Sequence, residues 1–128
     1  MLDSLELESI HRAKTGALLS TSVWLGAWLG GAASSELEAL LRFGQKIGLA
    51  FQIVDDVLDE TESRETLGKT AGKDRKRGKA TYPALLGIEQ SRCYVRELTT
   101  QAREAIRSLG SRAELLIGIS EFLETRGT

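Results

Sequence analysis

Residues 51–63 read FQIVDDVLDETES and place three aspartates and one glutamine in an otherwise apolar helical pattern. A carboxylate inside an apolar helix is costly unless a cation or a hydrogen-bond donor compensates it. At about 100° per residue, four polar side chains are expected within one arc of the helix: Gln52, Asp55, Asp56 and Asp59. Three apolar side chains are expected opposite them: Phe51, Val54 and Leu58. The four polar side chains are therefore predicted to form one polar face of the helix and to converge on one point.

The aspartates of this stretch predict a cation site. Two carboxylates four residues apart on a helix can share one cation, and oxygen ligands without histidine or cysteine select a hard ion such as Mg²⁺. Because Mg²⁺ keeps several waters and prefers one or two carboxylates together with phosphate oxygens, the helix reads as half of a diphosphate site. The competing interpretation is a solvated acidic helix end continued by Glu60 and Glu62, since short acidic motifs recur by chance.

Length and composition indicate one globular domain spanning residues 1–128. A formal net charge of −1 argues against the whole-chain electrostatics of a nucleic-acid binder. The single cysteine, Cys93, excludes an intramolecular disulfide and is expected to pack between helices. The opening sequence MLDSLELESIHR is acidic and lacks the apolar core of a secretory signal, so no such signal is expected.

Helical patterns dominate the chain, and no strand is predicted. Apolar periodicity and turn signals place helices at about 5–30, 37–58, 81–90, 92–109 and 112–126. Ser34 or Ser35 is the expected N-cap of the second helix, and Pro83 suits a first helical turn. The charged, glycine-containing stretch 60–79 is expected to be a long loop. These elements predict an all-α, antiparallel bundle layered around the helix at 37–58.

The apolar segment 15–33, TGALLSTSVWLGAWLGGAA, raises the question of a membrane span. Its hydroxyl residues and glycines interrupt it, and it follows directly on His11, Arg12 and Lys14. The small residues along it would let a neighbouring helix approach closely. We therefore expect a closely packed helix of a bundle and no membrane span.

Basic residues supply possible partners for the aspartates. Six of them follow the acidic run: Lys69, Lys73, Arg75, Lys76, Arg77 and Lys79. Lysines on glycine-rich backbone can close over a metal-bound diphosphate as mobile point charges. A nucleic-acid patch is the competing use, but no aromatic residue interleaves with these cations for base stacking. For 75–77 a plain solvated loop is preferred.

The first helix adds a third element. His11, Lys14 and Thr15 share a face by i, i+3 and i+4 spacing, so a cation and a hydroxyl project together. A lone histidine here fits a structural hydrogen bond better than a catalytic base. Lys14 is different, because a lysine at the edge of a closely packed helix needs an anionic partner.

Four motifs occur in order along the chain: IHRAKTGALL, GLAFQIVDDVLD, LGKTAGKD and GKATYPALLGIE. In this order and spacing they closely resemble the carboxy-terminal half of trans-isoprenyl diphosphate synthases, the polyprenyl synthetase family. Within that family the resemblance is greatest to the bacterial and plastid farnesyl and geranylgeranyl diphosphate synthases. It implies an isoprenoid synthase-like helical bundle. It also implies an enzyme that ionises an allylic diphosphate with the help of Mg²⁺, so that isopentenyl diphosphate can attack the cation.

The resemblance also implies roles for single residues. The metal-binding aspartates of the family match three residues, the first of them as the direct Mg²⁺ ligand: Asp55, Asp56 and Asp59. Its diphosphate-binding lysines match Lys14, Lys69 and Lys79. The groups expected to act in catalysis are Lys14 and two residues whose oxygens face the allylic cation, Thr15 and Gln52.

One departure from the family is plain. Its first aspartate-rich motif has no counterpart in residues 1–54, where no acidic residues form a DDxxD arrangement. We therefore expect a fragment of a longer synthase or one part of a split one, with little or no turnover by itself. The expected partners are the two diphosphate substrates and either a second copy, as in the homodimers usual in the family, or the missing amino-terminal half, in the cytoplasm or a plastid. The alternative is a non-catalytic helical scaffold that pairs with a catalytic prenyltransferase subunit.

Overall fold

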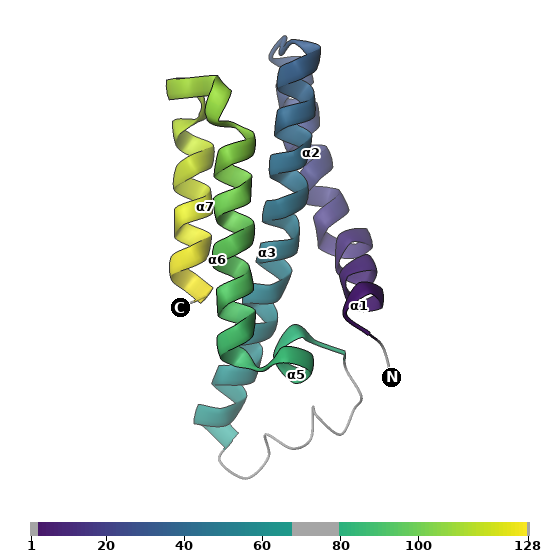
Figure 1. Ribbon diagram of the computed structural model, residues 1–128, viewed down its shortest axis with the longest axis vertical. Helices are drawn as coiled ribbons and strands as arrows, with labels where there is room; N and C mark the ends of the chain where they lie inside the picture. Colours follow the sequence, from purple (N-terminus) through teal and green to yellow (C-terminus); the bar gives the residue numbers. More distant parts are fainter. Residues whose placement is uncertain (1–2, 68–79, 128) are drawn as a thin grey trace.

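A long central helix, α3, organises the computed structural model, which describes residues 3–67 and 80–127 apart from the side chains at 11, 12, 66 and 67. α3 (Ser34–Leu67) has 34 residues and is about 50 Å long. In Figure 1 it runs between α2 (Ala17–Leu29) on one side and α6 (Ile88–Ala105) on the other, and it contacts both. The long helices alternate in direction along the chain (Figure 1). The predicted all-α class is confirmed.

The amino-terminal helix is interrupted by a wide turn. α1 (Ser4–His11) passes into a π-helical turn, η1 (Arg12–Gly16), and then into α2. In an unbroken α-helix, Leu7 and Gly16 would point in directions about 180° apart around the helix axis. The extra residue of a π turn reduces this angle by about 100°. Leu7 is buried in the core while Gly16 faces α3. The π turn therefore lets α1 and α2 use different faces against the same partner helix.

η1 and α2 approach α3 at backbone distance. A Cβ atom added to Gly48 would lie 2.6 Å from the Cα of Gly16, and one added to Gly44 would lie 2.7 Å from the Cα of Ser20. Ordinary carbon contacts are about 3.5–4.0 Å, so no larger residue fits at either position without moving a helix. These two contacts, one helical turn apart, seat the amino-terminal helix on α3.

Both ends of α3 differ from the sequence prediction. The helix begins at Ser34, so the N-cap position falls on Ala33, whose backbone N–H donates to the Glu36 carboxylate at 3.0 Å. The predicted loop from residue 60 was wrong as far as 67, because α3 continues there. Charged residues at i, i+4 spacing support this part, as in the ion pair between Glu60 and Arg64. The rest of the predicted loop, 68–79, lies outside the described residues.

A glycine divides the helix predicted at 81–90. α5 (Tyr82–Leu86) begins with Thr81, whose hydroxyl accepts from the Ala84 N–H at 3.2 Å, and Pro83 lies in its first turn as predicted. Gly87 then takes a φ of +86°, which is strained for residues with a side chain, and α6 begins at the next residue. α6 leads through a 3₁₀ turn, η2 (Arg107–Ala113), into α7 (Glu114–Gly127).

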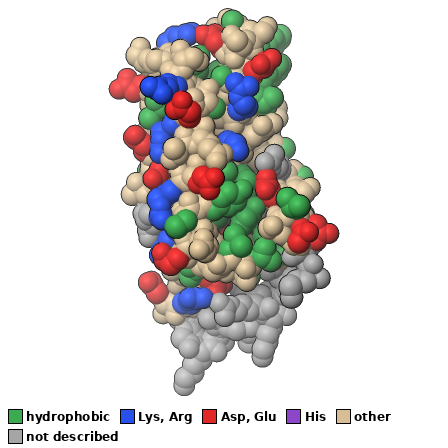
Figure 2. Space-filling view, in the orientation of Figure 1, with side chains coloured by type: hydrophobic (Ala, Val, Ile, Leu, Met, Phe, Trp, Pro, Cys, Tyr) green, Lys and Arg blue, Asp and Glu red, His purple; other side chains and the backbone are tan. Residues whose placement is uncertain are grey.

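The core lies between α3, α6 and α7, with one contribution from α1. Its largest fully buried apolar side chains come from α1, α3, α5 and α6 and from the residue that follows α6: Leu7, Phe43, Leu49, Ile53, Val57, Tyr82, Val95, Leu98 and Ile106. Hydrophobic side chains also gather on the surface between α6 and α1 (Figure 2), where Tyr82, Leu86 and Tyr94 line a groove. Among the described helices, none combines the length and the hydropathy that a membrane crossing requires.

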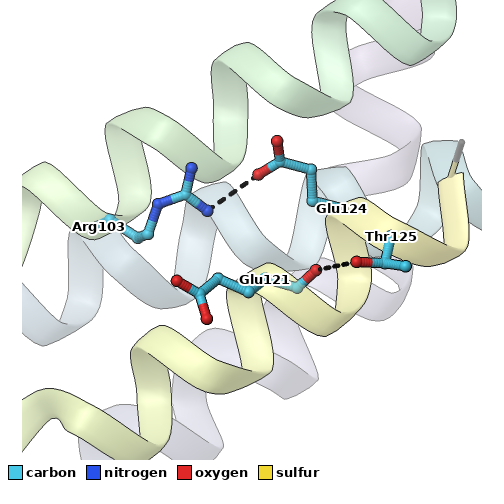
Figure 3. A pocket seen from close by; sticks show the side chains of 4 residues that line it. All are labelled: Arg103, Glu121, Glu124 and Thr125. Carbon is cyan, nitrogen blue, oxygen red and sulfur yellow. Dashed lines mark hydrogen bonds and ion pairs between the residues drawn. The ribbon is translucent and has the colours of Figure 1, made fainter.

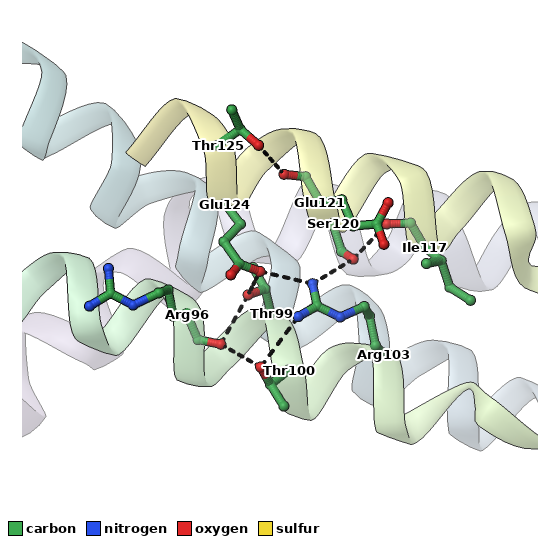
Figure 4. Close-up of polar contacts among 9 residues, drawn as sticks. All are labelled: Arg96, Thr99, Thr100, Arg103, Ile117, Ser120, Glu121, Glu124 and Thr125. Carbon is green, nitrogen blue, oxygen red and sulfur yellow. Dashed lines mark hydrogen bonds and ion pairs between the residues drawn. The ribbon is translucent and has the colours of Figure 1, made fainter. Parts of the chain in front are cut away.

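A polar cluster fixes α7 against α6 (Figure 4). The Nη1 atom of Arg103 lies 3.0 Å from the Glu124 carboxylate and 3.3 Å from the Ser120 hydroxyl, and Thr99 Oγ1 lies 3.0 Å from the same carboxylate oxygen. Thr99 and Ser120 are fully buried. Because buried hydroxyls must keep hydrogen-bond partners, the cluster fixes the register of the two helices.

The end of α7 reaches back to α3. A Cβ atom added to Gly127 would lie 3.1 Å from Val54 Cγ2 and 3.6 Å from Val95 Cγ1. Arg92 of α6 donates from Nε to the Gly127 carbonyl at 3.0 Å. The last turn of α7 is thus held against both neighbouring helices.

The α6–α7 cluster generates a prediction. Glu124→Ala leaves the Arg103 guanidinium and the Thr99 hydroxyl without this acceptor, so we expect the free energy of unfolding to fall by about 1–3 kcal/mol in a urea titration. Glu121→Ala is the matched control, because Glu121 lies on the same helix and lines a groove together with Arg103 and Glu124 (Figure 3). Its exposed carboxylate makes no ion pair in the described part of the chain. Equal losses for the two variants would contradict the role of the cluster.

An ion pair at the other end of the bundle joins α3 to η2. The Oε1 atom of Glu36 lies 2.5 Å from Arg112 Nη2. The Ala33 backbone N–H and then the Arg112 guanidinium hold the pKa of Glu36 below its ordinary value of 4.5. A depressed carboxyl pKa means that the stabilisation is present above the unfolded-state pKa and is lost as the pH falls through the folded-state value.

This pKa shift predicts a pH-dependent variant. Glu36→Gln should lower the melting temperature at neutral pH, and the difference from the wild-type protein should disappear as the pH falls through the lowered folded-state pKa of this carboxyl. Thermal unfolding followed by circular dichroism over this range measures the effect. Glu121→Gln, which changes an exposed carboxylate in the same way, should show no such convergence. If the melting temperature of Glu36→Gln stayed below that of the wild-type protein at the lowest pH, the electrostatic origin of the stabilisation would be contradicted.

Candidate functional site

One hydrogen bond joins the amino-terminal helix to the aspartate stretch. Thr15 of η1 donates from Oγ1 to Gln52 Oε1 of α3 at 3.0 Å, although the two residues are 37 positions apart in sequence. Gln52 is 6% exposed and Thr15 is partly buried. Because a buried amide is costly without hydrogen-bond partners, this bond fixes the orientation of both side chains. The structure therefore brings together two of the predicted site residues.

The four polar residues of the aspartate stretch do not share one face. Asp55 and Asp59 are exposed and lie four residues apart, whereas Asp56 is 3% exposed and points into the bundle with Gln52. Phe51 is 38% exposed. It was expected opposite the aspartates but shares their stripe, because four residues correspond to about 40° of rotation between Phe51 and Asp55. The predicted single polar arc is thus an outer pair of carboxylates and an inner polar pair.

The outer carboxylates suit a hard cation. Asp55 and Asp59 offer oxygen donors on successive turns of α3 at the surface. The described residues contain no cluster of three or more His, Cys, Asp or Glu side chains that could enclose a metal. This donor set fits an ion such as Mg²⁺, which keeps several waters and takes one or two carboxylates, better than a fully protein-coordinated metal.

The predicted lysines are only partly described. Lys14 is exposed and lies in η1, directly before Thr15. Lys69 and Lys79 lie outside the described residues. Within the described chain, the candidate residues therefore lie on two elements, Lys14 and Thr15 on η1 and the amide and carboxylates on α3, and the Thr15–Gln52 hydrogen bond is a polar contact between them.

The role of two glycines in α3 was not predicted from the sequence. Gly44 and Gly48 contact Ser20 and Gly16, and these contacts set how closely η1 and α3 approach at the site. A signal for them exists, since both pairs of small residues have the same four-residue spacing. Matched spacing of small residues on two helices is typical of a close crossing.

Several known proteins are similar to this chain. It is 47% identical over 121 residues to heterodimeric geranylgeranyl pyrophosphate synthase large subunit 2 of Arabidopsis thaliana, in a match that covers 94% of this chain and 32% of the relative. The chloroplastic geranylgeranyl pyrophosphate synthase of Capsicum annuum is 50% identical over 121 residues, with 94% and 33% covered. A dimethylallyltranstransferase of Fischerella ambigua is 46% identical over 125 residues, with 98% and 36% covered.

A solved structure shows the same arrangement of helices. It is that of a Marinomonas sp. MED121 protein assigned as a farnesyl-diphosphate synthase, with a TM-score of 0.75 and 33% identity over 96% of this chain and 40% of that one. The chain thus spans about a third of the length of the curated relatives it matches. The family description that matches residues 2–114 is polyprenyl synthetase, which confirms the resemblance carried by the four motifs. The chain belongs to the polyprenyl synthetase family.

Proposed function

We propose that this chain forms one wall of the diphosphate site of a Mg²⁺-dependent prenyl diphosphate synthase, which condenses an allylic diphosphate with isopentenyl diphosphate. The observation that carries the proposal is the meeting of η1 and α3. There Lys14 and Thr15 lie on η1, and the hydrogen bond from Thr15 to Gln52 joins η1 to the part of α3 that also presents two exposed carboxylates, those of Asp55 and Asp59. Family membership supports the same reaction class.

The charged groups of this wall would stabilise the diphosphate leaving group. Asp55, with Asp59 in support, would hold Mg²⁺, whose charge offsets the negative charge that develops on diphosphate as the allylic carbon–oxygen bond breaks. We assign Asp56 a supporting role from inside the bundle, since its side chain is buried behind the outer carboxylates. Lys14 adds a mobile ammonium group for the diphosphate, together with Lys69 and Lys79.

The neutral groups would serve the allylic cation. Because the Thr15 proton is donated to Gln52, the hydroxyl oxygen has only lone pairs to present to a third group. Such a dipole stabilises a carbocation without reacting with it as a free water would. The new carbon–carbon bond then forms from the isopentenyl double bond, and the loss of one proton restores a neutral chain.

The surface beside the carboxylates suits the rest of the substrate. Phe51 presents an exposed aromatic ring one turn before Asp55. An apolar ring next to a charged site matches a prenyl diphosphate, which joins an anionic head to a hydrocarbon tail. This amphipathic match favours a prenyl diphosphate over an inorganic anion.

The facing wall is proposed to come from outside the 128 residues. The relatives are about three times as long as this chain, and one of them is named as a subunit of a heterodimer. We therefore propose that the chain acts together with the remaining part of a family fold, within a homodimer or by pairing with a separate amino-terminal half. The cytoplasm or a plastid is the proposed compartment.

Metal-dependent pyrophosphate binding tests the proposed function. In calorimetric titrations with inorganic pyrophosphate, the wild-type chain should release heat only when Mg²⁺ is present. Asp55→Asn keeps the shape of the side chain but removes its charge, so we expect the affinity to fall at least about tenfold, or about 1.4 kcal/mol.

Glu38→Gln is the matched control, because Glu38 is an exposed carboxylate near the other end of the same helix. It should bind as the wild-type chain does. Equal affinities for Asp55→Asn and Glu38→Gln would overturn the assignment of Asp55. Wild-type protein without metal-dependent heat would favour the non-catalytic scaffold instead.

A further inference from the structure

We infer that the contact between Gly16 and Gly48 positions the site, because it sets the separation at which Thr15 can reach Gln52. Gly16 directly follows Thr15, and Gly48 precedes Gln52 by one helical turn, so the contact and the hydrogen bond lie on adjacent levels of the same helix crossing. The consequence for ligand binding rests on the proposed function. The geometric consequence stands without it.

The magnitude of the overlap supports this role. A Cβ atom at position 48 would lie 2.6 Å from the Gly16 Cα and 3.2 Å from its carbonyl oxygen, both backbone atoms that no rotamer change can move. Restoring an ordinary contact of about 3.5 Å requires the helices to separate by roughly 1 Å. The 3.0 Å bond between Thr15 and Gln52 would then lengthen to about 4 Å, beyond hydrogen-bond range.

The chain contains its own matched comparison. A Cβ atom at Gly44 would lie 2.7 Å from the Ser20 Cα, which is nearly the same overlap one turn farther from the site. A methyl group there tilts α2 away from α3 but leaves the contact between Gly16 and Gly48 in place. A purely structural role predicts equal effects for the two positions, whereas a positioning role predicts that only position 48 disturbs Thr15 and Gln52.

The experiment compares Gly48→Ala with Gly44→Ala in the 128-residue chain. Thermal unfolding measures stability, and the side-chain amide resonances of Gln52 in nitrogen–proton correlation spectra report the hydrogen bond, with Thr15→Val as the reference for its loss. Titration with inorganic pyrophosphate and Mg²⁺ measures the site. Gly26→Ala is the control for adding a methyl group to this part of the fold, because nothing lies within 4 Å of its Cβ position.

We expect the two variants to lose similar stability, while only Gly48→Ala shifts the Gln52 amide to its Thr15→Val position. Because Lys14 lies on η1 and moves with it away from the α3 carboxylates, Gly48→Ala should also weaken pyrophosphate binding at least about tenfold. Unchanged Gln52 resonances in both variants, or equal shifts in Gly44→Ala, would overturn the inference. Absence of pyrophosphate binding in the wild-type chain would overturn the proposed function alone, since the amide resonances still decide the positioning role.

Discussion

The approach of two helix backbones at Gly16 and Gly48 constrains the rest of the structure. With no Cβ atom on either side, η1 and α3 come close enough for a hydroxyl to bond an amide across the crossing. The same approach requires the amino-terminal helix to turn, since Leu7 must still reach the core. The π turn resolves this conflict, which explains why it lies at the residues that face α3.

A second constraint is that α3 serves as both core and site. α3 contacts both α6 and α7, its side chains Ile53 and Val57 are fully buried, and the inner polar residues Gln52 and Asp56 directly precede them in sequence. Only a narrow outer stripe remains for Phe51, Asp55 and Asp59. The packing of most of the helix circumference thus holds the carboxylates on a rigid element, which favours precise placement of charge.

The sequence predicted the helical class and the central position of the helix carrying the aspartates, and the family resemblance implied that Thr15 and Gln52 belong to one site. These features depend on apolar periodicity and on motifs, which are local signals. The continuation of α3 beyond residue 59 was missed because charge pairs, not apolar spacing, support it there. The division at Gly87 and the π turn depend on single backbone angles, for which the sequence offers several equivalent glycines. The inward orientation of Asp56 depends on which helices surround α3, and this is known only from the tertiary structure.

The last turn of α7 has a consequence for the carboxylate helix. Gly127 rests on Val54, the residue directly before Asp55, and the Arg103–Glu124 cluster fixes the height at which it does so. A shift of α7 along its axis would therefore be transmitted to the back of the turn that carries Asp55. α7 acts as a brace behind that turn, although most of it lies beyond the residues matched by the family description. Sequence changes far from the charged groups, on a helix that contains none of them, can thus alter how firmly those groups are held.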